Sequence, residues 1–238
     1  MTNEPNGASE LRSGLIEQLR TCRAIEREIF SALEPNDRDT TGPDGAWSAK
    51  DSLAHLSAWR HRQATKMAAV RAGGPEPGLP GTTIDETNAI FHAERASWTW
   101  ARVDADADAT AEALIAEVAA AGDEALTDPK VLGPIMGDGP EHDLGHLGAF
   151  AARVGMSDRV LHLADLTQAM LDHGAWPARS AAFARYNLAC FHALGGRTDT
   201  ARALLRLALP EDEELRTLAP TDDDLLALRT EIPSLIGE

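Results

Sequence analysis

The chain is poor in basic residues. Its 238 residues include 22 Lys and Arg against 38 Asp and Glu, so the formal net charge at pH 7 is −16. Proteins whose main task is to bind nucleic acid or an anionic membrane present a basic face, and this sequence has no basic stripe with interleaved aromatic residues. We therefore expect neither nucleic acid nor a membrane among its partners.

Cysteine, long apolar runs and alternating patterns are also scarce. Cys22 and Cys190 are far apart in the sequence and form no disulfide framework, which predicts a reduced, cytoplasmic setting. No run of about 18 apolar residues is present, and the polar N-terminal residues lack the apolar core of a signal peptide. No window alternates β-branched and polar residues with period two, so we predict an all-α chain.

Apolar residues instead recur at spacings of three and four. This pattern predicts a helix over residues 8–34, and a second that starts after Ser48, with Asp51 in a capping box, and ends at Gly73-Gly74. A third helix starts at Thr83, breaks at 104–108 and resumes over 110–126. A Gly/Pro-rich loop, residues 127–140, precedes a fourth helix. These helices predict a four-helix bundle.

The fourth predicted helix carries a histidine pair. Pro140 suits the first turn of a helix, and His142 and His146 then share one face because they are four residues apart. Two histidines supply only two metal ligands, and a bundle would bring His55 of the second helix beside them. Three imidazoles with one open position are typical of a catalytic zinc or nickel site. The alternative is a chance pair among eight histidines, with His55 a hydrogen-bonded core residue.

The stretch from Trp47 to Trp59, WSAKDSLAHLSAW, resembles the second-helix signature of DinB-like four-helix-bundle proteins. The Gly/Pro loop 73–82, the segment IDETN (84–88) and the helix with the histidine pair are similar to the ClbS/DfsB branch of that superfamily. The resemblance covers residues 10–157. It implies an up-down-down-up bundle over residues 8–157, with a metal triad of His55, His142 and His146.

Some members of the ClbS/DfsB branch work without a metal. The resemblance then implies that Asn88 and His92 on the third helix are catalytic, activating water or holding the reactive molecule, with Trp59 and Arg62 as walls of the substrate pocket. The alternative for these residues is a solvated helix face.

The C-terminal region, residues 158–238, predicts further helices that start near Ser157, Arg179, Thr198 and Thr221. The segment YNLACFHALGGR (186–197), followed by small residues, resembles a tetratricopeptide repeat. A free-standing repeat array needs at least three repeats, and this region is shorter. We therefore expect it to dock on the bundle, on a second copy in a homodimer, or on a protein partner.

The resemblance to the DinB-like superfamily and to its ClbS/DfsB branch implies an enzyme that acts on small reactive electrophiles. The first expectation is a metal-assisted hydrolase with a detoxification or self-resistance role, whose substrate enters past the loops 73–82 and 127–140. The first alternative is an S-transferase that uses a low-molecular-weight thiol of the mycothiol type as cosubstrate. The second is a non-catalytic protein that sequesters a small molecule and binds a partner through its repeat-like tail.

Overall fold

A computed structural model of the chain describes residues 7–41, 47–172 and 176–235. Within these ranges the secondary structure is helical with no strand, which confirms the predicted all-α class. Residues 236–238 of the predicted C-terminal region lie outside the described part. The α-helices are α1 (Gly7–Ala32), α2 (Ala49–Arg71), α3 (Ile84–Arg95), α4 (Trp100–Ala120), α5 (Asp123–Leu126), α6 (Pro129–Gly137), α7 (Pro140–Arg153), α8 (Ser157–Asp172), α9 (Ala178–Leu194), α10 (Thr198–Ala208), α11 (Glu213–Leu218) and α12 (Ile232–Leu235). The 3₁₀ helices are η1 (Pro35–Asp37), η3 (Leu209–Glu211), η4 (Ala219–Thr221) and η5 (Asp223–Leu228).

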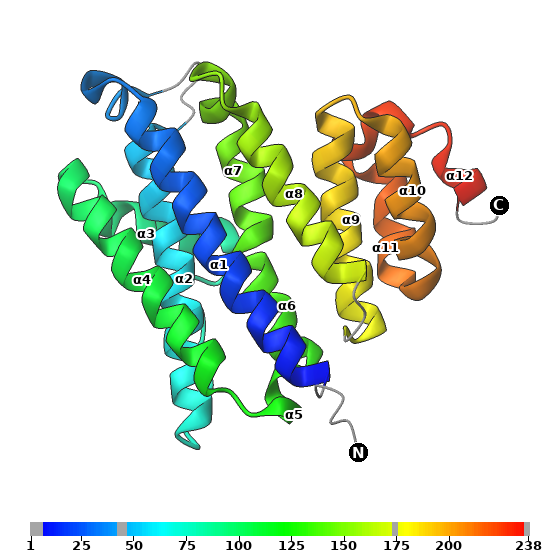
Figure 1. Ribbon diagram of the computed structural model, residues 1–238, viewed down its shortest axis with the longest axis horizontal. Helices are drawn as coiled ribbons and strands as arrows, with labels where there is room; N and C mark the ends of the chain where they lie inside the picture. Colours follow the sequence, from blue (N-terminus) through cyan, green and yellow to red (C-terminus); the bar gives the residue numbers. More distant parts are fainter. Residues whose placement is uncertain (1–6, 42–46, 173–175, 236–238) are drawn as a thin grey trace.

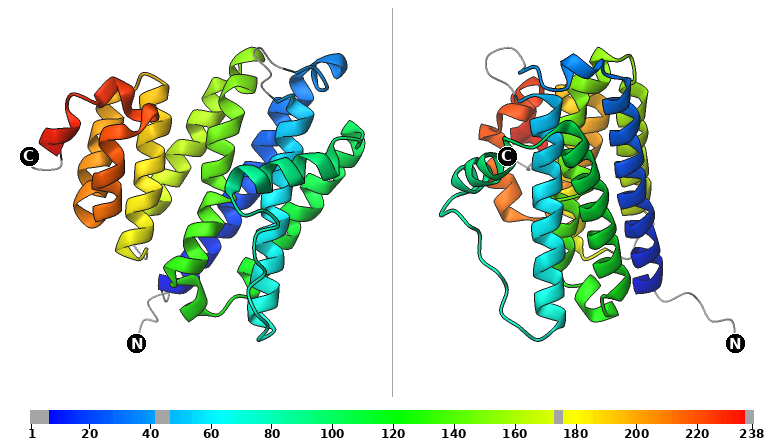
Figure 2. Two further views of the ribbon diagram at one scale, coloured as in Figure 1. Left: turned by 180° about the vertical axis from the view of Figure 1, so that it is seen from behind. Right: turned by 90° about the vertical axis from the view of Figure 1, so that its left-hand side faces the viewer.

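Four long helices lie side by side (Figures 1 and 2). α1 packs on α4 and α7, and α2 packs on α4 and α7. α1 and α7 run in one direction, and α2 and α4 run in the opposite direction (Figure 1). α3 packs against α2 on the outside of this group, as the two views of Figure 2 show. Among the described residues, no helix is both long and apolar enough to cross a membrane.

The apolar positions that predicted the long helices form the core. Leu15 and Ile29 of α1, Leu53 of α2, Leu114 of α4 and Leu147 of α7 are all fully buried. α2 also buries several polar side chains, which is unusual for a helix held only by apolar packing. These side chains are Ser52, His55, Ser57, Arg60 and Gln63.

The C-terminal helices continue the same core. α8 packs on α1 and α7, and α9 pairs with α10 across a turn in which Gly196 has a φ of 73°. One buried cluster extends from Ile29 in α1 to Leu228 in η5. The expected docking of this region on the preceding helices is therefore present in the chain, whereas its division into domains 8–157 and 158–238 stays a prediction.

The predicted break at residues 104–108 is wrong. α4 runs through this segment without interruption, and the chain turns earlier, after α3. The Thr99 side chain caps α4 by accepting from the N–H of Arg102. Val103 and Ala107 are fully buried, while Asp104 and Asp108 of the same segment bind Arg23 of α1. The acidic residues therefore bind a cation across the helix interface and do not interrupt the helix.

The predicted loop at residues 127–140 is also wrong. Asp128 caps α6 by accepting from the N–H of Lys130, and Pro129 occupies the first turn, where a missing N–H is tolerated. An apolar stripe then packs inward, formed by Leu132, Ile135 and Met136, which are all buried. The route for a substrate that we expected past this loop is consequently lined by a helix.

The final predicted helix differs in type. The segment after Asp222 forms η5, a 3₁₀ helix, and α12 follows it. In a 3₁₀ helix residues three apart lie above one another, and η5 buries Leu225 and Leu228 while Leu226 is 64% exposed. A short helix that the sequence did not predict, α11, starts after Asp212, whose side chain accepts from the N–H of Glu214.

Candidate metal centre

His55 is placed by a well-defined helix start. The Ser48 side chain accepts from the N–H of Asp51, and the Asp51 side chain accepts from the N–H of Ser48, which forms the predicted capping box. His55 then lies in the second turn of α2 and is 7% exposed. This local signal fixes the register of the helix and hence the side that His55 faces.

The other two histidines depend on the start of α7. Pro140 is in its first turn, as predicted, and Gly139 precedes it with φ −121° and ψ −112°. A Cβ at Gly139 would lie 2.8 Å from the carbonyl oxygen of Ile135 and from a methyl group of Leu19. Such contacts are too close for any other residue. Gly139 therefore lets the chain pass tightly from α6 into α7.

The structure brings the three histidines together. One ring nitrogen from each of His55, His142 and His146 lies within 4.8 Å of the other two. The Nε2 atoms of His55 and His142 are 2.8 Å apart. The ring centroids of the three pairs are separated by 4.6 to 4.9 Å. The predicted metal ligands from α2 and α7 thus converge on one point.

The surroundings keep these imidazoles neutral. Burial lowers the pKa of His55 to about 3, with a further contribution from nearby His146. Burial also lowers the pKa of His142 well below its ordinary value, helped by His55 and His146, and burial lowers the pKa of His146. Neutral imidazole has the free lone pair that a metal ion needs.

The donor set fits a divalent metal ion. In a tetrahedral zinc site, metal–nitrogen bonds of about 2.0–2.1 Å put ligand nitrogens roughly 3.4 Å apart. The Nε2 atoms of His55 and His142, 2.8 Å apart, are somewhat closer than that, and the ring nitrogens of all three histidines lie within 4.8 Å of one another. In the described part of the chain, the Nδ1 atoms of His55 and His142 are buried without a hydrogen-bond partner. Few protein contacts therefore compete for these two rings.

Trp47 packs against the triad, although the sequence analysis assigned it no function. Its ring stacks on His146 at a centroid distance of 6.3 Å, and it meets His55 edge-on at 4.6 Å. It also stacks on His92 at 5.9 Å. Trp47 directly precedes the cap of α2, so the fixed helix start also positions this ring. Its place in the signature stretch was the only signal in the sequence.

The predicted pocket residues lie beside the triad and are tied to each other. Trp59 Nε1 donates to Oδ1 of Asn88 over 3.0 Å, and the Arg62 guanidinium lies 5.6 Å from the centroid of the Trp59 ring. Trp59 itself is 6.3 Å from His142, between ring centroids. His92 stacks on Trp47 and lies 3.4 Å from Asp51, with 41% of its side chain exposed. Asn88 therefore contacts Trp59 and His92 contacts Trp47, and these two tryptophans in turn pack against the triad.

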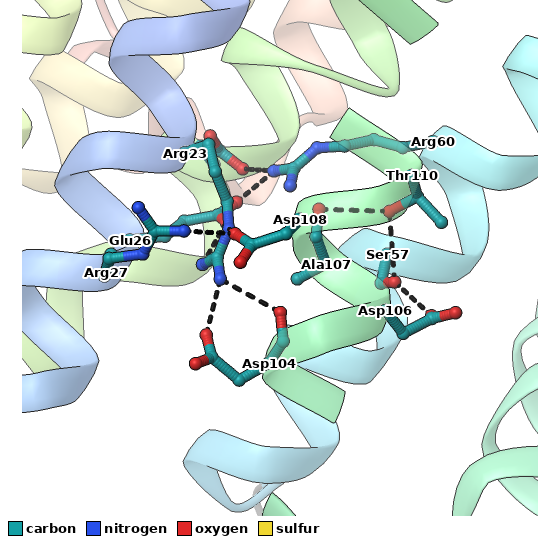
Figure 3. A network of polar contacts seen from close by, with 11 residues as sticks. Arg23, Glu26, Arg27, Ser57, Arg60, Asp104, Asp106, Ala107, Asp108 and Thr110 are labelled. Atoms are coloured by element: carbon teal, nitrogen blue, oxygen red, sulfur yellow. Dashed lines mark hydrogen bonds and ion pairs between the residues drawn. The ribbon is translucent and has the colours of Figure 1, made fainter. Parts of the chain in front are cut away.

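A buried polar network connects α2 with α1 and α7, and Figure 3 shows it from close by. Arg60 of α2 contacts Glu26 of α1 and Asp143 of α7, and all three side chains are at most 1% exposed. Arg23 of α1 joins Glu26 and extends the network to α4. Sequence reasoning missed this network because charged residues in amphipathic helices usually face water.

Two carboxyl groups close to His142 were also missed. Asp138 ends α6 and Glu141 precedes His142, and burial raises the pKa of each to about 7. A carboxyl group with such a pKa can exchange a proton near neutral pH. Adjacency to His142 was the only signal in the sequence.

Comparison with known proteins identifies the family of the chain. The family model of the DinB superfamily matches residues 18–153, which is more than half of the chain and includes α2, α7 and all three histidines. Searches of curated proteins and of solved structures returned no match. The chain belongs to the DinB superfamily.

Proposed function

We propose that this chain is a metal-dependent enzyme of the up-down-down-up four-helix-bundle type, and that it hydrolyses small reactive electrophiles in a detoxifying role. The observation that carries the proposal is the convergence of the neutral imidazoles of His55, His142 and His146. The antiparallel relation of α1 and α7 to α2 and α4 supports the bundle type. The IDETN segment supports the ClbS/DfsB-like branch.

Three protein ligands leave a position open for a reactant, as in catalytic sites. A bound zinc or nickel ion would lower the pKa of a ligated water or thiol and polarise the electrophile. His55, His142 and His146 hold this position from two helices, so its geometry does not depend on a loop. Trp47 and Trp59 form apolar walls beside it and limit the access of bulk water.

The residues of α3 orient the reactant. Asn88 accepts from Trp59 through Oδ1, which leaves its Nδ2 to donate to an oxygen of a bound molecule. His92 lies 3.4 Å from Asp51, and its imidazole can accept a proton from water and pass it to the leaving group. These two roles also apply to a reaction without metal.

The C-terminal region supports a secondary proposal. α9 and α10 pack closely through small buried residues, namely Ala189, Ala193, Ala201 and Ala208. This packing and the tight turn at Gly196 support a tetratricopeptide-like unit. Because the unit already packs on the preceding helices, we assign it a role in completing the core rather than in forming an independent array.

The central test is metal analysis of the protein purified without a histidine tag. We expect one divalent ion per chain, lost in His142→Ala and His146→Ala with unchanged helical content. His162→Ala is the matched control because His162 is exposed on α8. Full activity of the metal-stripped wild type would overturn the metal mechanism.

Activity is measured as ring opening of styrene oxide, a strained electrophile, with and without a low-molecular-weight thiol. Diol formation without thiol supports the hydrolase. A strict requirement for thiol would replace it with the S-transferase, and stoichiometric capture without product release would indicate sequestration.

A further inference from the structure

A cavity lies between α7 and the C-terminal helices. Its volume is about 410 Å³. It is bounded by residues of α7, α9, α11 and the start of η5. His142 of the triad is one of the residues that line it. The cavity therefore adjoins the candidate metal centre through a shared side chain.

The polar lining of this cavity is acidic. Glu141, Asp222 and Asp224 contribute carboxyl groups, and none of the described lining residues is Lys or Arg. Asp222 accepts from the Tyr186 hydroxyl over 2.7 Å, and Glu141 accepts from Nδ2 of Asn187. Both donors are neutral. In the described structure none of the three carboxyl groups forms an ion pair.

The described lining itself holds no cation, which has an energetic consequence. Arg229 lies next to it but donates to the Asp222 carbonyl oxygen and to Asp223, not to a lining carboxyl group. Carboxyl groups gathered at a partly buried cavity repel each other and lose hydration, and a positive charge placed between them relieves both effects. Burial and the neighbouring acidic groups raise the pKa of Asp224, as expected for this environment. The remaining lining is apolar and includes the side chains of Leu144, Phe183, Phe191 and Leu215.

The walls leave room for a ligand. Gly137 and Gly145 both line the cavity, and a Cβ built on either would meet no atom within 4 Å. Gly145 lies within α7, where glycine costs about 1 kcal/mol relative to alanine. His142 presents a further unmet need, because its Nδ1 is buried with no hydrogen-bond partner among the described residues. When His142 holds its proton on Nε2, this Nδ1 is an acceptor, and a ligand that carries a hydrogen-bond donor could satisfy it.

We propose that this cavity binds a small organic cation, an amine or ammonium group carried on an apolar body. The carboxyl groups of Asp222, Asp224 and Glu141 hold the positive group, and the leucine and phenylalanine side chains pack on the apolar body. Because His142 belongs to both sites, an electrophile that carries such a cationic group would be held beside the metal centre; this last step rests on the proposed function, whereas the binding itself does not.

The test uses Tyr186, which lines the cavity and is the one tyrosine of the chain. Protein labelled with ¹³C in the tyrosine ring gives a single resonance that reports on this cavity. The probes are phenethylamine, its neutral analogue phenethyl alcohol and the anionic hydrocinnamate. We expect a saturable shift with phenethylamine, and binding weaker by about tenfold or more for the other two probes.

Two variants locate the binding. Asp224→Asn should weaken phenethylamine binding by about tenfold, because it removes one of the carboxyl groups that hold the cation. Asp223→Asn is its matched control, with the same change of net charge at an exposed neighbour outside the cavity. Gly145→Leu should abolish binding by filling the cavity, and it leaves every carboxyl group in place.

Three results would overturn the proposal: no shift of the Tyr186 resonance, equal binding of the amine and the alcohol, or equal weakening in Asp224→Asn and Asp223→Asn. The titration needs no turnover and is repeated on the His146→Ala variant. If the protein binds metal and opens styrene oxide but does not bind phenethylamine, the proposed function is supported and the cation site is contradicted. If it binds phenethylamine but neither binds metal nor turns over styrene oxide, the cation site is supported and the proposed function is contradicted.

Discussion

Arg60 donates from Nη2 to Oδ1 of Asp143 over 2.6 Å, and this ion pair joins α2 to α7 in the interior of the protein. The same guanidinium contacts Glu26 of α1. Asp143 directly follows His142, and Arg60 stands little more than one helical turn after His55. The ion pair therefore links the two helices that supply the three histidines, close to the point where they meet.

Arg60→Met should destabilise the protein by about 3–5 kcal/mol, because it leaves Glu26 and Asp143 buried with their principal cation removed. Urea unfolding followed by circular dichroism measures the change. Arg71→Met is the control: it breaks the surface pair with Glu117, in which Arg71 is 52% exposed, and should cost less than about 1 kcal/mol. Similar values for both variants would mean that the buried network contributes little to stability.

The parts of the fold and site that could be predicted from sequence have local causes. Ser48 with Asp51 determines where α2 begins, and Pro140 marks the first turn of α7. The spacing of His142 and His146 follows from helical geometry alone. Placing His55 beside them needed the predicted bundle as well, because spacing within one helix says nothing about which helices are neighbours.

The remaining features are consequences of packing. Asp104 and Asp108 suggested a break in the helix, yet α4 is continuous and both residues bind Arg23 of the facing helix. Arg60 has the sequence pattern of a solvated residue but is 1% exposed, since Glu26 and Asp143 come from helices distant in sequence. The acidic cavity likewise combines α7 with residues some eighty positions later, which no local pattern could connect.

Trp47→Ala should weaken metal binding by about 10–100-fold without removing a ligand, because the Trp47 ring packs on His55 and His146 and limits their orientations. Competition with a chromophoric chelator measures the affinity. Trp98→Ala is a suitable control, since Trp98 packs with Arg95 and Arg102, away from the triad. An unchanged affinity in Trp47→Ala would show that the three histidines are held without this ring.

His55 should make the metal-stripped protein sensitive to acid. Its pKa falls from 6.5 to about 3 on folding, so below about pH 6.5 the unfolded chain binds a proton that the folded chain excludes. Stability from this residue is fully present above that pH and is lost progressively toward about pH 3, with a slope of up to about 1.4 kcal/mol per pH unit. Urea unfolding across this range should show a smaller pH dependence in His55→Gln. If the free energy of unfolding varied with pH in the same way in the wild type and in His55→Gln, the burial of a neutral His55 would be contradicted.

Glu141 should make the stability of the metal-stripped protein fall as the pH rises, which is the opposite of the effect of His55. Burial raises the pKa of Glu141 from 4.5 to about 7, so the folded chain retains a proton that the unfolded chain releases. Its contribution is therefore fully present below about pH 4.5 and is lost as the pH rises through about 7. Glu141→Gln, which preserves an acceptor for Asn187, should stabilise the metal-stripped protein by up to about 3 kcal/mol at pH 8 and give no gain at pH 4. Glu10→Gln removes an exposed carboxylate of α1 and corrects for the change in net charge. If both variants gained equally at pH 8, relief of general charge repulsion would account for the effect, and Glu141 would be ionised in the folded protein at that pH without penalty.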